Sequence, residues 1–508
     1  MALVHCRVNS LCSVRRALCL SVFVTSLFWA GPRWACAAVA PVLTALADQP
    51  VRLAIKPPAN LTLALSVEWP TGEVQAYNDE VMNGCPGRDT IYSVCYFDPP
   101  TRASKAGLTQ TSQPYVGYFD PYKCYSYDST KGWFAPIGTT VGYVSSLAID
   151  KQPATSKAQC SGSWSGNFLN WATMQTIDMF RWAMTGGDRL EGADSIGLTV
   201  LERASTRRTG GDGQFPTKRI GLAYTSGSNS VSAVAPSSIS PQSWSTLYLR
   251  QLGDSTSLST AIQISDRSDF SKNVSTLNVR VKVCDSTLFP SSGSLPMESA
   301  TTCTGYGTAP VNWKPTGLIQ ENAMTVRFAA FGYLKDDSLW RDGGVMRARM
   351  KFVGPSQPIL ASPGFTSNPN GEWDATTGIY RSNPDPSDAS ATQAATGVSV
   401  AQSGVIRYLN RFGRLSGYKQ KDPVSEMYYE TLRYYRGLKA PTAEYVDLNL
   451  ITASTSNSVK VDGFPVIRNW DDPLVPPTGW SEATEWCPKN YVIGLSDSNT
   501  HRDKRLPG

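Results

Sequence analysis

Short apolar runs bounded by turn signals recur along this chain and predict buried strands. Leu61–Leu65 follows the Pro-rich turn signal 57–60, Val326–Leu334 reads VRFAAFGYL, and Tyr491–Leu495 reads YVIGL. Mostly apolar runs of this length are typical of strands buried on both faces. The three runs are therefore predicted to lie inside one or more sheets.

Two further segments alternate strictly between apolar and polar positions. Residues 277–283 place Leu and Val between Asn, Arg and Lys, and residues 346–352 place Met, Ala and Phe between Arg and Lys. A period of two predicts strands with one buried face. The basic face of 346–352 could contact an acidic partner, but we interpret it as the solvated side of its strand.

Apolar spacing of the helical kind appears at three places. Residues 165–187 predict one heavily buried helix that ends at Gly186-Gly187, and residues 316–324 predict a shorter one. Asp422-Pro423 begins a third, since Asp favours the N-cap and Pro the first helical position. In the second half of the chain helices alternate with buried strands, which favours an α/β fold with parallel strands.

Three stretches interrupt this alternation. Residues 72–163 are rich in Tyr, Gly, Pro and Cys, residues 205–312 look β-rich, and residues 354–400 are rich in Pro, Ser, Asn, Ala and Thr and predict an extended surface loop. Five tyrosines crowd the segment 115–127. They could form an aromatic binding surface, but we favour a packed cluster in which the rings are buried and the hydroxyl groups reach solvent.

The N-terminus predicts export. Arg7, Arg15 and Arg16 precede the apolar run Ala17–Ala30, and Ala35-Cys36-Ala37 offers a cleavage site. The run is shorter than the roughly 20 residues that span a bilayer, so we predict a signal peptide over residues 1–37 and a mature chain without a transmembrane segment. Four arginines fall in this signal, which leaves 43 basic and 41 acidic residues in the mature chain. That balance gives no basis for nucleic-acid binding.

Export exposes cysteines to oxidising conditions, so disulfides are expected. The sequence-local candidate pairs are Cys85–Cys95, Cys124–Cys160 and Cys284–Cys303, although spacing alone cannot fix connectivity. The mature chain has an odd number of cysteines, and Cys487 is the best candidate for the unpaired one.

Histidine is nearly absent, because His501 is the single histidine of the mature chain. This removes His-rich metal sites and most acid–base machinery, so we expect no enzyme and no catalytic residues. A Ser-His-Asp hydrolase would need His501 as its base. A carboxylate site is more plausible, since ligands of open α/β sheets lie at the carboxyl ends of strands.

Glu68 follows the first strand, Asp497 follows the last, and Asp422 opens a helix, so the three carboxylates should converge. Such oxygens suit Mg²⁺ or Ca²⁺. Each residue also has a purely structural explanation that needs no metal: Asp422 as a helix cap, Asp497 as the start of a turn, and Glu68 as an exposed side chain.

Several segments, in order along nearly the whole mature chain, resemble the PilC/PilY class of type IV pilus tip-associated adhesin and biogenesis proteins. They are YFDPYKCYSYD (118–128), CSGSWSGNFLNWATMQTIDMFRWAMTGGDR (160–189), TVLERA (199–204), GLIQENAMTVRFAAFGYL (317–334), DGGVMRARMKFVG (342–354), DPVSEMYYETLRYYRG (422–437) and WCPKNYVIGLSDSNTHRDKRLPG (486–508).

The resemblance implies a von Willebrand factor A-like sheet with helices on both faces over residues 38–508, with the three stretches above as insertions. It implies an exported protein of the periplasm, outer-membrane surface or pilus tip (the fimbrium). Such a protein contacts minor pilins and the pilus machinery, supports twitching motility and binds a host-surface receptor.

Two departures from the family pattern alter these expectations. The metal motif D-x-S-x-S is replaced by Ser66-Val67-Glu68-Trp69-Pro70, so metal-dependent adhesion is not expected in its usual form. The sequence also stops at Gly508, where the resemblance places a C-terminal β-propeller, so we expect a truncated form without it.

The leading hypothesis is a pilus biogenesis and adhesion factor that acts by protein–protein or surface binding. The alternative is a secreted carbohydrate-binding surface protein that uses the Tyr-rich region, and a secreted hydrolase is a third.

Overall fold

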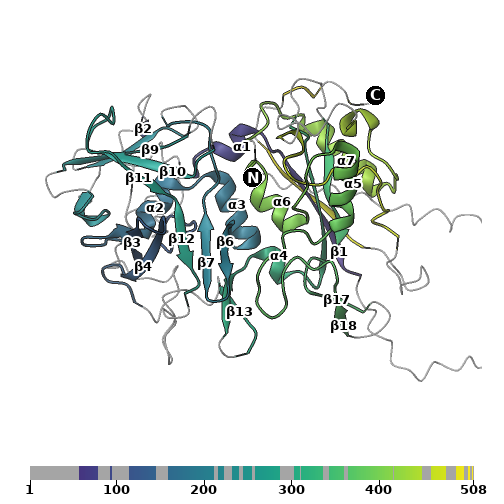
Figure 1. Ribbon diagram of the computed structural model, residues 1–508, viewed down its shortest axis with the longest axis horizontal. Helices are drawn as coiled ribbons and strands as arrows, with labels where there is room; N and C mark the ends of the chain where they lie inside the picture. The colour runs from purple at the N-terminus through teal and green to yellow at the C-terminus, as the bar shows by residue number, and fades with distance from the viewer. Residues whose placement is uncertain are drawn as a thin grey trace, which may run out of the picture.

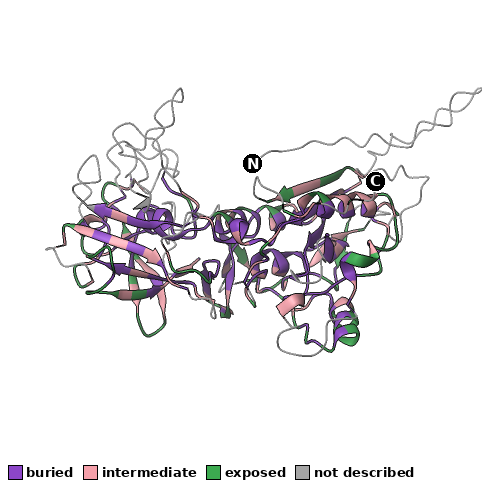
Figure 2. Ribbon diagram, turned by 90° about the horizontal axis from the view of Figure 1, so that it is seen from above, coloured by how far each residue is buried: buried purple, intermediate pink, exposed green. Residues whose placement is uncertain are grey.

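The structure is a computed structural model. It describes residues 57–77, 92–93, 96, 114–144, 158–210, 215–221, 231–239, 244–253, 258–285, 303–308, 311–335, 343–359, 364–415, 417–448, 459–475, 488–496, 501–503 and 506. The chain is mixed α/β and forms two lobes, a β-rich lobe and a sheet lobe in which helices flank the strands (Figure 1). Buried residues run through both lobes and through the segment between them (Figure 2).

The sheet lobe contains four described strands in the order β16–β15–β1–β19. The central strand β1 (Ala59–Leu65) runs parallel to β15 (Val326–Gly332) and β19 (Asn490–Leu495), whereas β16 (Val345–Lys351) is antiparallel to β15. These strands coincide with four of the predicted segments, which are thereby confirmed. Leu63, Ala64 and Leu65 are at most 2% exposed, as expected for a parallel strand covered on both sides.

Helices cover both faces of this sheet. On β15, Phe331 packs against Tyr434 of α7 (Val424–Tyr435), while the next residue, Gly332, lies against Tyr408 of α6 (Val405–Arg411). Consecutive strand residues point to opposite faces, so α7 and α6 lie on opposite sides. A Cβ at position 332 would meet the Tyr408 hydroxyl, so the close approach of α6 requires glycine there.

The β-rich lobe holds two described sheets and their shared core. The six-stranded sheet has the order β5–β3–β4–β12–β7–β6, and the five-stranded sheet has the order β11–β10–β9–β8–β2. The first contains β3 (Lys123–Asp128), β4 (Trp133–Thr139), β5 (Trp164–Ser165), β6 (Arg189–Ser195), β7 (Leu198–Glu202) and β12 (Arg280–Val283). The second contains β2 (Tyr92–Ser93), β8 (Thr217–Gly221), β9 (Thr246–Gln251), β10 (Ala261–Ser265) and β11 (Ser275–Asn278).

The alternating segment 277–283 is the corner between these two sheets. It was predicted as one strand, but β11 pairs with β10 and β12 pairs with β7, and Val279 lies between them. A strand that changes sheets at a bend is how packed sheets close at their corners. Val279 and Val281 are each 1% exposed, so both parts contribute to one core.

The helix predicted over 165–187 is two helices. Helix α2 (Gly166–Thr173) ends before Met174, and α3 (Thr176–Thr185) begins with a capping box between Gln175 and Asp178. The break leaves Asp178 buried, where it accepts hydrogen bonds from the backbone N–H groups of Gln175 and Ala204. The predicted stop is confirmed, since Gly186 ends α3 with φ of 81°.

Helix α3 joins the two lobes. Ile177, Phe180 and Met184 belong to the core of the sheet lobe, while Met179 and Trp182 pack against the core of the β-rich lobe. The side chain of Arg181 crosses toward α6 and donates to the carbonyl oxygens of Leu409 and Phe412. One helix therefore serves both hydrophobic cores.

The Tyr-rich segment is packed inward. Tyr115, Tyr118, Tyr122 and Tyr125 are all below 5% exposed and Tyr127 is half-buried, so they do not form the exposed aromatic surface that a carbohydrate site would need. Two of the predicted disulfides are confirmed, Cys124–Cys160 and Cys284–Cys303. The signal peptide, Cys85, Cys95 and Cys487 lie outside the described residues.

Two expectations for the later half are wrong. Residues 354–400 are not one extended loop, because they include the hairpin of β17 (Ser356–Pro358) and β18 (Phe365–Ser367) and the helix α5 (Pro386–Thr396). The basic face of β16 is not a solvated stripe. Arg347 is 1% exposed and donates to backbone carbonyls, and Arg349 is paired with Asp388 of α5.

The remaining elements connect these parts. They are α1 (Trp69–Glu73), η3 (Val231–Ala233), β13 (Cys303–Tyr306), β14 (Asn312–Pro315), α4 (Leu318–Glu321) and η5 (Ala443–Val446). Over the described residues, no helix is long and apolar enough to cross a membrane.

Candidate metal centre at the end of the central strand

The carboxyl end of β1 is where the sequence predicted a site, and the structure brings two of the three predicted carboxylates together there. Glu68 immediately precedes α1, and Asp422 lies two residues before α7. Both side chains are fully buried. Asp497 lies outside the described residues, so its predicted role stays a prediction.

Backbone pairing explains why Glu68 and Asp422 meet. The segment that leads to Asp422 runs beside the end of β1, where the Lys419 N–H donates to the Val67 carbonyl and the Trp69 N–H donates to the Lys419 carbonyl. Glu68 forms an isolated parallel bridge with Lys419. The two carboxylates are thus positioned by hydrogen-bonded backbone on both sides.

His501 completes the cluster. Its Nδ1 lies 3.0 Å from Asp422 Oδ1 and 3.5 Å from Glu68 Oε1, and its backbone N–H donates to the Asp422 carbonyl and carboxylate. The ring is 49% exposed, in contrast to the two buried carboxylates. One ligand atom of each residue lies within 4.8 Å of the others, which is close enough for one cation to reach all three.

The helix prediction at Asp422 was wrong in one respect. The Asp422 side chain does not cap α7, which has no side-chain cap from its own N-terminal neighbours. Instead Asp503 accepts hydrogen bonds from the Ser425 and Glu426 N–H groups and from the Ser425 hydroxyl. The segment 501–503 therefore supplies both an imidazole to the cluster and a cap to the helix.

Tyr333 lies at the same edge, just after β15. Burial, followed by the negative charges of Asp422, Asp503 and Glu68, raises the pKa of Tyr333 well above its usual value. The phenol therefore stays neutral. The carboxylates that raise its pKa include Glu68 and Asp422, whose negative charge a bound cation would balance.

The donor set has consequences for chemistry. Two carboxylates and one imidazole fit a first-row divalent ion such as Zn²⁺ or Mn²⁺ better than Mg²⁺ or Ca²⁺, which prefer oxygen ligands alone. The all-oxygen adhesion motif expected from the family does not fit, since Glu68 and Pro70 stand where it has serines.

The surroundings of His501 also bear on the hydrolase hypothesis. Asp422 contacts one ring nitrogen as a triad acid would. However, among the described residues no serine or threonine hydroxyl hydrogen-bonds to His501, and the nearby Ser425 hydroxyl is donated to Asp503.

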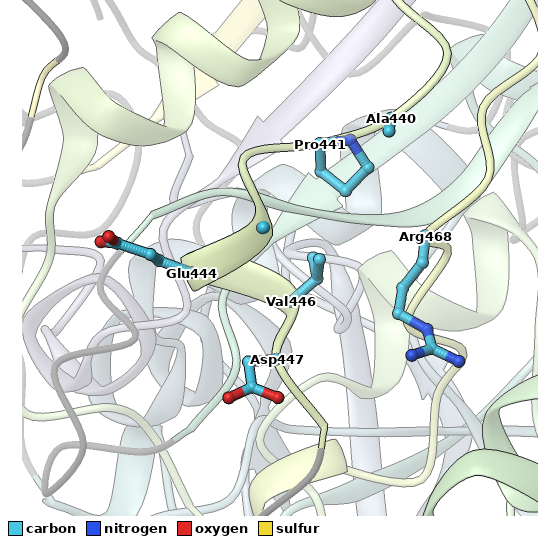
Figure 3. A pocket seen from close by; sticks show the side chains of 7 residues that line it. Ala440, Pro441, Glu444, Val446, Asp447 and Arg468 are labelled. Carbon is cyan, nitrogen blue, oxygen red and sulfur yellow. The ribbon is translucent and has the colours of Figure 1, made fainter.

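A shallow cleft of about 490 Å³ lies elsewhere in the sheet lobe, between η5 and the segment of Arg468. Glu444 extends away from Arg468, and small apolar side chains form much of the wall (Figure 3). Its charged residues do not pair a nucleophile with a base, so the cleft adds no catalytic constellation.

Comparisons with known proteins agree on one family. Residues 109–247 match the family described as PilY1 homolog, small alpha/beta domain, and residues 341–508 match the one described as PilY1 homolog, second domain. Two curated relatives from Xylella fastidiosa strain Temecula1, both called type IV pilus biogenesis factor PilY1 homolog, are 37% and 23% identical to this chain. No solved structure matches.

The alignments cover 83% and 78% of this chain but only 33% and 26% of those relatives, so the chain spans about a third or less of their length. Two residues of the candidate metal centre, Asp422 and His501, lie within the matched second domain. The two matched domains and the identity over most of the sequence place this chain in the PilY1-like family of type IV pilus proteins.

Proposed function

We propose that this chain is a type IV pilus biogenesis and adhesion factor that works through its surfaces and not through bond-making chemistry. The observation that carries the proposal is the 37% identity, over most of this sequence, to a relative called a type IV pilus biogenesis factor. The chain would be exported and would act in the periplasm, on the outer-membrane surface or at the pilus tip, together with minor pilins. A host-surface receptor would be its adhesion partner.

The sheet lobe supports a von Willebrand factor A-like interpretation. Its central strand is parallel to both neighbours, helices α6 and α7 lie on opposite faces, and the candidate cluster is at the carboxyl ends of the strands. Such a scaffold places loops for recognition at one edge of a rigid sheet. We propose that this edge, with Glu68, Asp422 and His501, is the recognition end of the lobe.

The pilus role is tested by a clean deletion in the producing bacterium. Surface pili, counted by electron microscopy, and twitching motility should both fall, and the wild-type gene should restore them. The exported chain should also co-purify with minor pilins after crosslinking. Normal piliation and motility in a strain that lacks every member of the family would remove the proposal.

We further propose that the cluster binds one divalent ion. The purified exported chain should retain about one equivalent of Zn²⁺ or Mn²⁺ by elemental analysis, and Asp422→Asn and His501→Ala should each reduce it. Asp471→Asn is the matched control, since Asp471 is 80% exposed and pairs with Arg349 outside the cluster. Equal metal content in all four proteins would show that the cluster holds no ion.

A further inference from the structure

One lysine and two acidic residues meet in the sheet lobe. Lys351, the last residue of β16, pairs with Phe328 near the start of β15, so it lies at the opposite end of the sheet from the candidate metal centre. Its Nζ lies 2.7 Å from Oδ1 and 2.6 Å from Oδ2 of Asp385, and 3.2 Å from Oε1 of Glu372. The Glu372 side chain is 1% exposed, and those of Lys351 and Asp385 are 13% and 11% exposed. One amine therefore faces two carboxyl groups in a place from which water is largely excluded.

The backbone holds the two carboxyl groups in place. The Glu372 N–H donates to the Val353 carbonyl, just after β16, and the Asp385 N–H donates to the Ser403 hydroxyl. The amine also donates to the Asn370 carbonyl. Groups that are kept in one arrangement react much faster than groups that must first find each other.

Asp385 does not act as an ordinary helix cap. It occupies the N-cap position of α5, where an Asp side chain normally accepts a hydrogen bond from the first N–H groups of the helix. Here the side chain makes no such bond, and both of its oxygens face the Lys351 Nζ instead. Because the carboxyl carbon lies between these two oxygens, it is presented directly to the nitrogen.

Glu372 is placed to move protons at this nitrogen. Its two oxygens accept hydrogen bonds from the Val405 and Ile406 N–H groups, which fix the orientation of the carboxyl group. Burial raises the pKa of Glu372, and although Lys351 lowers it again, Asp385 adds to the rise and the net pKa is raised. A carboxyl group with a raised pKa carries a proton more readily near neutral pH, as general acid–base catalysis requires.

We propose that Lys351 and Asp385 condense into an intramolecular amide bond, with Glu372 as the catalytic acid and base. One proton passes from the ammonium of Lys351 to the carboxylate of Asp385, and the freed nitrogen lone pair forms a bond to the Asp385 Cγ. Glu372 takes a second proton from the nitrogen and delivers it to the departing hydroxyl group. The C–O bond breaks, one water molecule leaves, and the Glu372 carboxyl group is restored. No oxidant, reductant or co-reactant is consumed.

The product suits its surroundings. A buried ion pair loses hydration that its mutual attraction repays only in part, whereas the amide carries no charge. The bond joins β16 to α5 across 34 positions of the sequence. A reductant does not cleave it, in contrast to the two cystines of the β-rich lobe.

Mass spectrometry of the full exported chain tests the proposal. After reduction of the disulfides, the wild type should be lighter than its mature sequence by the mass of one water molecule. Trypsin should not cleave after the acylated Lys351, so the digest should contain peptide 350–381 linked to peptide 382–407. Tandem spectra should place the link at Lys351 and Asp385. A simple ion pair would instead give the full mass and normal cleavage after Lys351.

Three variants separate the roles of the residues. Glu372→Gln keeps an oxygen acceptor for α6 but loses the acid, and Lys351→Arg keeps the positive charge but cannot form the amide, so both should have the full mass. Asp388→Asn is the matched control, since Asp388 lies on α5 and pairs with Arg349, and it should still lose one water. Circular dichroism checks that each variant is folded.

The wild-type mass decides the question even where a variant does not fold. Folded wild-type chain with the full mass would overturn the proposal. A folded Glu372→Gln protein that carries the link as completely as the wild type would overturn the role of Glu372. The buried pair of Lys314 and Asp194 offers an internal comparison, because the second charged neighbour of Asp194 is Arg189 and not an acid. That pair should remain unlinked in the same digest, and a link there would show that burial suffices without a third carboxyl group.

Discussion

At the scale of single residues, the segment 501–503 shows how a few side chains close the edge of a sheet. His501 contacts two buried carboxylates, and Asp503 caps a helix that starts almost 80 residues earlier in the chain. The sequence indicated that Glu68 and Asp422 would converge. It did not indicate Asp503 as a cap, because caps are recognised by local spacing and this one comes from a distant segment.

We predict that Asp503→Ala lowers the free energy of unfolding by about 1 kcal/mol, the usual effect of losing a helix cap. The cause is the loss of the acceptor for the Ser425 and Glu426 N–H groups. Urea denaturation followed by circular dichroism measures the change. Asp503→Asn keeps an acceptor oxygen and should cost less, and equal losses in the two variants would contradict a capping role.

At the scale of elements, the β13–β14 hairpin is fixed to β6 by buried charge. The Lys314 ammonium lies 2.8 Å from Asp194 and also donates to the Ser195 and Leu198 carbonyls, while Arg189 lies 3.1 Å from Asp194. Burial by itself would raise the pKa of Asp194, but Arg189 and Lys314 outweigh it and the net pKa is lowered below 3.8. The ionised carboxylate is thus favoured in the folded state.

Because the pKa of Asp194 is lowered on folding, the free energy of unfolding should decrease as the pH falls. The stabilisation by Asp194 is fully present above its unfolded pKa, near 4, and is lost as the pH falls through the lower folded value. We expect Asp194→Asn to be less stable than the wild type at pH 7 and to show a flatter stability profile below about pH 4. Urea titrations from pH 2 to pH 7 measure both. Identical slopes below pH 4 would exclude this contribution.

The same scale shows what the sequence could predict. Strands β1, β15, β16 and β19 were found because each has a clear apolar run or alternation, and the Gly186 stop was found because a left-handed cap requires glycine. Helix α5 was missed, since PSDASATQAAT has no apolar stripe and only three of its residues are buried. The break at Met174 was missed because both halves are apolar, so the periodicity continues across it.

The N-terminus of α6 shows the same effect of contacts that are distant in sequence. The N–H groups of Val405 and Ile406 donate hydrogen bonds to the carboxylate of Glu372, which is distant in sequence. Arg347 was expected in solvent because its strand alternates, yet backbone carbonyls surround it. In these cases tertiary contacts supply partners that no local pattern encodes.

At the scale of the whole molecule, the two lobes meet through buried charges as well as through α3. Arg414, which follows α6, contacts Asp188 beside β6 and lies 2.9 Å from Glu202 of β7. Both carboxylates are nearly fully buried. A guanidinium shared by two acids from the other lobe fixes the relative position of the lobes, since no other side chain offers the same fork of donors.

We predict that Arg414→Leu lowers the free energy of unfolding by about 3 kcal/mol, because it removes the cation shared by two buried carboxylates. In the described part of the chain, Asp188 then keeps only its longer contact with Arg411, and Glu202 keeps Arg280. Differential scanning calorimetry should then resolve two transitions where the wild type has one. Arg407→Leu is a control, since Arg407 lies on the neighbouring helix α6 and, among the described residues, its hydrogen bond is to the Arg381 carbonyl and not to a carboxylate. A single sharp transition in Arg414→Leu would contradict the coupling.

The placement of the two described cystines bears on how the molecule responds to its redox surroundings. Cys124–Cys160 ties β3 to the segment before β5, and Cys284–Cys303 ties the end of β12 to β13. Both therefore constrain the unfolded ensemble of the β-rich lobe, where each closed loop contributes roughly 3 kcal/mol. A reductant that cleaves these two cystines should loosen that half of the molecule, while the described contacts of the edge that bears His501 are hydrogen bonds and packing, which a reductant does not cleave.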